Sequence, residues 1–409
     1  MKRVFSAAFA AFFVAVAAAS AAPGPDMRLA EQLFLQGQFD QARAIYATVP
    51  KSDKLYETAL RQLGAIALYQ NHLGEAELML TDARARNPVD ESAITLLAET
   101  YAREGKFSDM ADLLRQLGRP DRAAEFALFG KAQPFRIVGK PGTATIEFQW
   151  TDPLPVVRAR VNNLDGLFLL DTGAPELILD PDFAKDAHVP MTTPAGPSGG
   201  AGSPVFGRVA KVILPGVEVD DVPAMMLNTR ALMVLARQKR LAGVIGTEFL
   251  SHFRFTLDYV HDRLILEPHD APPRSGGAVA EIPFWFLGDH FLLASGRVDK
   301  APKQLFLIDT GIGSYAFTGP ESTLHDAGIP VPAPKGVQRG AITPGATFPI
   351  KQLSLGSLEE QNQTGVYGPF PPSLEKALGV HVGGIVAHRF FEPYTVTFDF
   401  VRMMITVRK

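Results

Sequence analysis

The sequence predicts a multidomain α plus β protein, with an N-terminal solenoid of paired helices followed by two related all-β lobes. Two repeats carry this prediction. Between residues 27 and 130, small and large apolar residues recur every 34 positions, which is the length of a helix–turn–helix unit. Later in the chain, an apolar run ends in Asp-Thr-Gly twice, at 167–173 and again at 305–311. The second part of the chain is therefore interpreted as a duplicated β unit.

The composition is typical of a globular protein and argues against several classes of function. Apolar residues make up 46% of the 409 positions and charged residues 20%, which is enough apolar material for several cores. The chain has no cysteine, so a disulfide framework and thiol chemistry are excluded. The formal net charge of -3 and the lack of long basic runs argue against nucleic acid as a partner.

The N-terminus has the pattern of a secretory signal peptide. Lys2 and Arg3 precede an Ala-rich apolar run of about sixteen residues, and small residues follow it up to Ala21. That run is shorter than the ~20 residues that a membrane-spanning helix needs, although an uncleaved anchor is the alternative interpretation. We expect residues 1–21 to be removed and the mature protein to be periplasmic or secreted, with no stable membrane span.

The helical segment, residues 27–130, keeps its period in five columns. These columns are Leu29, Leu63 and Leu97; Ala30, Gly64 and Ala98; Phe39, Leu73 and Phe107; Ala42, Ala76 and Met110; and Tyr46, Leu80 and Leu114. Small residues where helices cross, with larger residues between them, resemble the tetratricopeptide repeats. The resemblance implies a short solenoid whose concave face holds a protein or peptide partner. A spacer or a dimer surface is the alternative.

From residue 134 onward, short β-branched and aromatic runs alternate with Gly/Pro turns, as expected for strands. We place a first lobe at 134–268, a Pro/Gly-rich linker at 269–277 and a second lobe at 278–409. The ends of the two lobes also match at an offset of 141 positions. The matched pairs include Gly243 with Gly384, Phe249 with Phe390, Thr256 with Thr397 and Asp258 with Asp399. The duplication therefore spans both ends of each lobe.

A strand, Asp-Thr-Gly-Ala, a Gly/Pro loop and a later apolar-apolar-Gly stretch together resemble the retropepsin-like aspartic peptidases, especially bacterial exported members. The resemblance covers about residues 134–409 and includes both Asp-Thr-Gly turns. It implies an N-terminal tetratricopeptide α-solenoid followed by two retropepsin-like all-β lobes that form a pepsin-like bilobal unit. It also implies an aspartic-type endopeptidase that cleaves a polypeptide in the interlobe cleft and uses neither cofactor nor metal.

The resemblance assigns catalysis to Asp171 and Asp309. Two like charges at hydrogen-bond distance do not both ionise easily, so the pair is expected to share a proton and to activate water. The residues expected to support the turns are Thr172, Gly173, Ala174, Thr310 and Gly311. Gly243 and Gly384 are expected to pack beneath the turns. The candidates for a mobile flap over the cleft are Gly199, Gly200, Gly202 and Phe206.

One residue departs from the family pattern, and it leaves alternatives open. Ile312 follows the second Asp-Thr-Gly, whereas Ala174 follows the first. If Ile312 fills the space between the two Asp side chains, the protein is a non-catalytic periplasmic scaffold that retains the lobes to bind peptides. Two further interpretations are that both Asp residues only cap turns, and that lobes pair between chains in an obligate dimer.

Overall fold

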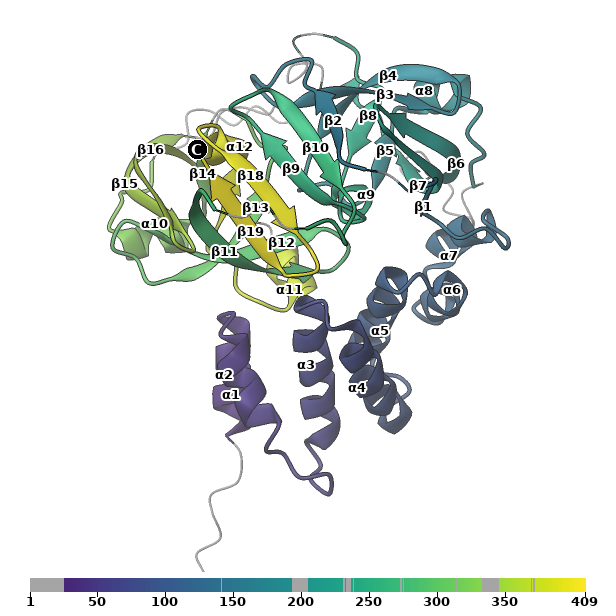
Figure 1. Cartoon of the computed structure of the whole chain (residues 1–409). Coiled ribbons are helices and arrows are strands. Elements are labelled where there is room, and N and C mark those ends of the chain that lie inside the picture. Colours follow the sequence, from purple (N-terminus) through teal and green to yellow (C-terminus); the bar gives the residue numbers. More distant parts are fainter. Residues whose placement is uncertain are drawn as a thin grey trace, which may run out of the picture.

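A computed structural model describes residues 26–409, apart from 141, 193–204, 231, 233–236, 238, 273, 275, 314, 333–345, 369 and 371. The helices of the N-terminal part of the chain gather on one side of the β-strands, beneath them in the view of Figure 1. The expected signal segment 1–21 lies outside the described residues, as do the flap candidates Gly199, Gly200 and Gly202.

The helical domain consists of three helical hairpins and a seventh helix. The elements are α1 (Met27–Leu35), α2 (Phe39–Tyr46), α3 (Tyr56–Tyr69), α4 (Leu73–Arg86), α5 (Glu91–Arg103), α6 (Phe107–Gln116) and α7 (Pro120–Ala127). The second helix of each hairpin begins at one member of the Phe39, Leu73 and Phe107 column, so the 34-residue step is the step between hairpins. Small residues are needed where helices cross, because a Cβ on Gly64 would lie 2.6 Å from Leu80 Cγ. None of the helices in the described ranges has the length and apolar character to cross a bilayer.

The first lobe is built mainly on a sheet of seven strands in the order β1-β7-β5-β8-β4-β3-β6, closed by a further pairing of β6 with β7. Its elements are β1 (Arg136–Ile137), β3 (Val156–Val161), β4 (Leu164–Leu170), β5 (Leu177–Leu179), α8 (Pro181–Asp186), β6 (Val205–Leu214), β7 (Val217–Met226), β8 (Gly243–Ile245) and α9 (Thr247–Leu250). Strand β3 shows the alternation that places one face in the core, since Arg158 and Arg160 are exposed between buried Val157, Ala159 and Val161.

A second sheet of twelve strands forms the second lobe and continues into the first. Its order is β13-β17-β14-β16-β15-β12-β11-β19-β18-β9-β10-β2. The strands are β2 (Ala144–Glu147), β9 (Arg254–Asp258), β10 (Arg263–Glu267), β11 (Ala278–Leu287), β12 (Phe291–Val298), β13 (Gln304–Asp309), β14 (Phe317–Gly319), β15 (Thr347–Leu355), β16 (Leu358–Tyr367), β17 (Gly384–Ala387), β18 (Thr395–Asp399) and β19 (Met404–Arg408). The helices of this lobe are α10 (Glu321–Ala327), α11 (Pro372–Leu378) and α12 (His388–Phe391).

The two lobes are joined where β9 pairs with β18 in antiparallel register. Thr256 lies opposite Thr397, and their hydroxyl oxygens are 2.8 Å apart. The rings of Phe255 and Phe398 stack beside them with centroids 4.6 Å apart. Thr256 and Thr397, which the 141-position offset equates, therefore face each other across the join, as expected at a twofold axis between the lobes.

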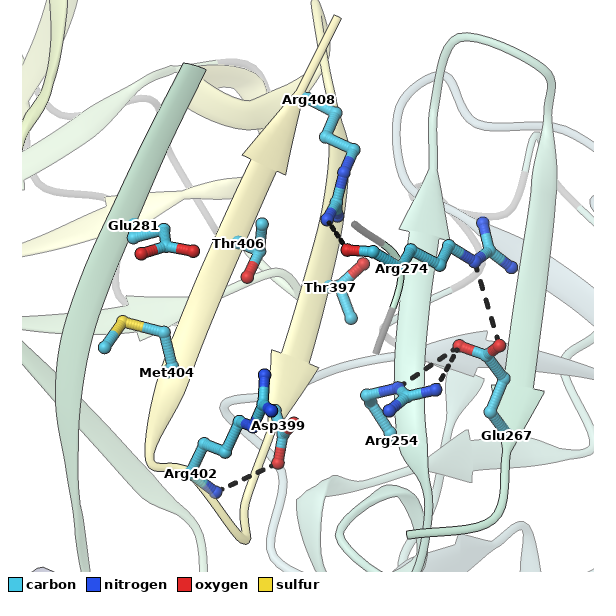
Figure 2. Close-up of a pocket in the computed structure, with 10 residues that line it drawn as sticks. All are labelled: Arg254, Glu267, Arg274, Glu281, Thr397, Asp399, Arg402, Met404, Thr406 and Arg408. Carbon is cyan, nitrogen blue, oxygen red and sulfur yellow. Dashed lines mark hydrogen bonds and ion pairs between the residues drawn. The ribbon is translucent and has the colours of Figure 1, made fainter. Parts of the chain in front are cut away.

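Side chains on one face of this joint sheet, shown in Figure 2, hydrogen-bond the segment that leads from β10 to β11. Arg254 is buried, and its guanidinium lies 3.2 Å from Glu267 Oε2 and donates to the carbonyls of Ala271 and Pro272. Arg408 donates in the same way to the carbonyls of Arg274 and Gly276. Two arginines on the sheet thus hold the backbone of the linker in place.

The helical domain contacts both lobes. Arg103 of α5 donates to the carbonyls of Phe286 and Gly288 in the second lobe, at 2.8 Å each, and its guanidinium lies 3.9 Å from the Phe286 ring centroid. On the first lobe, Arg208 of β6 donates to the carbonyl of Leu128, just after α7, at 3.1 Å. Through these contacts the helical domain is attached to both lobes.

Candidate active site

The two Asp-Thr-Gly segments form equivalent turns at the ends of two strands. Asp171 directly follows β4 and Asp309 ends β13, and these strands run parallel to β8 and β17 respectively. In each turn the carboxylate accepts a hydrogen bond from the glycine two residues later: Gly173 N lies 2.7 Å from Asp171 Oδ1, and Gly311 N lies 2.8 Å from Asp309 Oδ1. Each carboxylate is thereby oriented by its own turn.

The threonines of the two turns hold the turns together across the lobe boundary. Thr172 N donates to Thr310 Oγ1 and Thr310 N donates to Thr172 Oγ1, at 3.0 Å in both directions. Thr172 Oγ1 also donates to the carbonyl of Ile308 at 3.0 Å. Both threonines are only 1% exposed, so these bonds replace water that the buried groups have lost.

The glycines face the carboxylate of the opposite turn. A Cβ added to Gly173 would lie 2.4 Å from Asp309 Cγ, and one added to Gly311 would lie 2.1 Å from Asp171 Cγ. Any side chain at either position would displace a carboxylate, so the close approach itself requires glycine. Two Asp residues 138 positions apart in the sequence thus meet in one site.

Burial and proximity keep a proton on this pair. Burial raises the pKa of Asp171, and it raises the pKa of Asp309 well above its usual value, to which the nearby charge of Asp171 adds. The side-chain hydrogen bond between them favours the charged form of Asp171 and the neutral form of Asp309. The two carboxyl groups titrate as a coupled pair, because the charge of Asp171 raises the pKa of Asp309.

Ile312 does not separate the two carboxyl groups. Its side chain is partly exposed, and its backbone N–H hydrogen-bonds Asp309, which opposes the rise in the pKa of that carboxyl. The next residue, Gly313, packs against the loop before β3, where an added Cβ would lie 2.9 Å from the carbonyl oxygen of Pro153. With Ile312 in place, each carboxylate still faces the glycine of the opposite turn.

Gly243 and Gly384 lie further from the turns than the sequence suggested. In the strand register they lie opposite Phe168 and Phe306, three residues before each Asp. Only glycine fits at these positions, because a Cβ would lie 1.9 Å from the carbonyl oxygen of Ile178 at Gly243 and 2.0 Å from the Phe317 ring at Gly384. They permit close strand crossings.

Gly246 and Thr247 support the first turn directly and were not predicted. A Cβ on Gly246 would lie 2.6 Å from the carbonyl oxygen of Ala174. Thr247 Oγ1 donates to the carbonyl of Thr172 at 2.8 Å. The second copy reads Ala387 and His388 at the matching positions, so the internal repeat carries no signal for this pair.

Among the flap candidates, the structure describes Phe206. Its ring is buried at the start of β6, with the Arg122 guanidinium 4.8 Å from the ring centroid. Its backbone N donates to Thr192 Oγ1 at 3.1 Å. Phe206 therefore packs against the helical domain at the base of the candidate flap, where its ring is not free to close over a cleft.

No cluster of three or more His, Cys, Asp or Glu side chains suited to a metal ion occurs in the described part of the chain.

Residues 157–249 match the family described as aspartyl protease; this segment includes Asp171 and Gly246 and ends before the second lobe. Among solved structures, the chain is similar to a retropepsin-like aspartic protease from Rickettsia conorii, at 21% sequence identity and a TM-score of 0.23. That match covers 32% of this chain and 95% of the other. No curated protein matches the chain.

Proposed function

We propose that the protein is an exported aspartic endopeptidase whose two lobes form a pepsin-like bilobal unit in one chain. The observation that carries the proposal is the reciprocal arrangement of the turns. Each Asp faces the glycine of the opposite turn, and the two threonines exchange hydrogen bonds between lobes. A pair of carboxyl groups that share one proton supplies a general base and a general acid at the same place.

In the proposed reaction, Asp171 is the ionised member and Asp309 the protonated one. Asp171 takes a proton from a bound water while Asp309 donates its proton to the carbonyl oxygen of the peptide bond, and the water oxygen bonds to the carbonyl carbon. The C–N bond then breaks as Asp171 passes its proton to the leaving nitrogen. The carbonyl re-forms and returns the other proton to Asp309. Every atom of the enzyme is restored without a covalent intermediate.

We further propose that the helical domain is a tetratricopeptide solenoid that recruits protein substrates. A cavity of about 800 Å³ lies between its helices and the second lobe. Its lining includes Tyr69 and Glu99 from the helices, Leu287 and Asp289 from the turn between β11 and β12, and Glu248 beside the first catalytic turn. An extended polypeptide fits a groove of this size. The proposal is supported by Glu248 in the lining, because the preceding residue, Thr247, hydrogen-bonds the first catalytic turn.

The second candidate is a non-catalytic peptide-binding scaffold. It is favoured by Ile312, which stands where the first turn has Ala174. In that case the two lobes bind a peptide without cleaving it, and the Asp pair only stabilises the turns.

Cleavage of an unbiased peptide mixture by the purified mature protein, from acid to neutral pH, tests the two candidates. We expect wild type to cleave peptides, and Asp171→Asn and Asp309→Asn to lose cleavage while retaining a cooperative thermal transition. Asp165→Asn is the matched control, because Asp165 lies on β4 with its side chain 49% exposed and pairs with Arg160. Folded wild type that cleaves nothing at any pH supports the scaffold.

A further inference from the structure

The seventh helix brings a charged side chain from the helical domain into the first lobe. Arg122 Nη1 lies 2.8 Å from Glu176 Oε2 and 3.0 Å from Glu176 Oε1, and it also contacts Glu125 in its own helix. The side chains of Glu176 and Glu125 are 3% and 0% exposed. Arg122 therefore ties two domains together through buried charges, where a broken ion pair is costly.

Glu176 belongs to the segment that continues the first catalytic turn. The backbone of this segment is fastened to the start of α9: Thr247 N donates to the carbonyl of Ala174 at 2.9 Å, and Glu248 N donates to that of Pro175 at 2.7 Å. Thr247 also bonds the carbonyl of Thr172 inside the turn. A short run of hydrogen bonds thus connects Arg122 to the residues next to Asp171.

Arg122 also balances the charge of a buried carboxyl cluster. Glu125, Glu176 and Glu248 all act on it electrostatically. Burial and the charge of Glu176 raise the pKa of Glu248 to about 8, and no group among the described residues hydrogen-bonds Glu248 Oε2. Without the guanidinium, the carboxylates either bind protons or move apart because their like charges repel.

The same guanidinium lies 4.8 Å from the centroid of the Phe206 ring, at the base of the candidate flap. A cation over an aromatic face is attracted by the negative charge of the ring face. One side chain of the helical domain therefore contacts both Glu176 and Phe206 of the first lobe.

We propose that Arg122 is a positioning residue of the active site, acting through Glu176 on the first catalytic turn. The helical domain is then part of the catalytic apparatus as well as a recruiting surface. This inference rests on the proposed peptidase function, since it concerns the geometry of the same turns.

The test compares Arg122→Met with wild type in peptide cleavage. Methionine keeps an unbranched apolar stem and removes the cation. We expect kcat to fall by roughly ten- to a hundredfold, because a displacement of about 1 Å at a reacting centre has effects of that order. KM is expected to change far less, since Arg122 does not contact the carboxyl pair. The acid limb of the pH profile is expected to move to higher pH, because loss of a nearby positive charge raises carboxyl pKa values.

Three further variants separate positioning from general damage. Arg122→Lys keeps the charge but loses the planar fork, so it should fold and recover part of kcat. Arg122→Met combined with Glu176→Gln should lose less than the sum of the two single losses, because both remove one interaction. Arg43→Met is the matched control, since Arg43 pairs with Glu75 within the helical domain and its side chain is 37% exposed.

Amide hydrogen exchange of the free protein gives a second readout that does not need activity. Residues 174–178 and 244–250 should exchange faster in Arg122→Met than in wild type, and Arg43→Met should leave them unchanged. The proposal is overturned if Arg122→Met has the kcat and the amide exchange rates of wild type. It is also overturned if Arg43→Met loses as much kcat as Arg122→Met does, or if the kcat of Arg122→Lys is no higher than that of Arg122→Met. If wild type cleaves no peptide, the proposed function fails, and exchange alone decides the role of Arg122.

Discussion

At the scale of single residues, the proton shared by Asp171 and Asp309 sets the pH range of the proposed reaction. Burial raises the pKa of both carboxyls, and that of Asp309 the more strongly. Cleavage should appear as the pair loses its first proton and disappear as it loses the second. The upper limit should lie well above ~3.9, the pKa of a free Asp side chain. A profile of kcat/KM against pH measures both limits, and loss of cleavage near the free value contradicts the shared proton.

The glycines that face the carboxylates give a second prediction. In Gly311→Ala the new Cβ would lie 2.1 Å from Asp171 Cγ, so the carboxylate has to move. We expect cleavage to fall at least a hundredfold and stability to fall by about 1–3 kcal/mol, as in other overpacked sites. Gly74→Ala is the control, because a Cβ there meets nothing within 4 Å and alanine favours a helix. Urea unfolding and peptide cleavage check both variants; an active Gly311→Ala would show that the turns are not this close.

How much of the site was predictable depended on where its contacts lie in the chain. The Asp, Thr and Gly of each turn are adjacent in sequence and occur twice, so a local motif and its repeat identified them. Thr247 and Arg122 were missed for physical reasons. The second copy has His388 where the first has Thr247, and the contact of Arg122 with Glu176 depends on how α7 docks. No periodic pattern encodes such a docking contact.

At the scale of elements, the sequence predicted that the lobes are copies of one unit, but it did not predict the sheet that joins them. The 141-position offset equated Thr256 with Thr397, and the structure places them opposite each other on β9 and β18. The register follows because identical apolar patterns on two strands bury the same face when they pair. The linker was predicted from its Pro and Gly residues, but its fastening by Arg254 and Arg408 was not, because carbonyl acceptors leave no trace in a sequence.

This fastening predicts a large loss of stability in Arg254→Met. Removing the guanidinium leaves Glu267, whose side chain is 8% exposed, without its buried partner and frees two linker carbonyls. We expect unfolding free energy to fall by about 3–5 kcal/mol, as when one member of a buried ion pair is removed. Arg402→Met, on the same face but exposed, should change it by less than about 0.5 kcal/mol. Urea unfolding of both variants measures these free energies. Equal losses in the two variants would show that Arg254 stabilises the protein no more than an exposed arginine does.

At the scale of the whole molecule, the helical domain and the lobes meet through charged groups that have lost water. Arg103 binds the second lobe and Arg122 the first, so the two lobes share one helical support. The sequence predicted the order of these parts, but not how the helices sit on the strands. The two docking arginines lie outside the five repeat columns. One column residue also takes part in the docking, since the ring of Phe39 lies 5.3 Å from that of Trp285.

The buried carboxyls at this meeting point make stability depend on pH. Glu248 has a pKa of about 8 in the folded protein against 4.5 when free, so the folded state holds its proton more tightly than the unfolded state does. The stability that this proton gives is complete below pH 4.5 and is lost progressively as pH rises to about 8. Glu248→Gln has no charge to bury. Its thermal midpoint should equal that of wild type in acid and exceed it above pH 8. The control Glu281→Gln, at an exposed position on β11, should have the thermal midpoint of wild type at every pH. A Glu248→Gln variant that is equally destabilised at both pH values would show that this carboxyl is held by hydrogen bonds in its charged form.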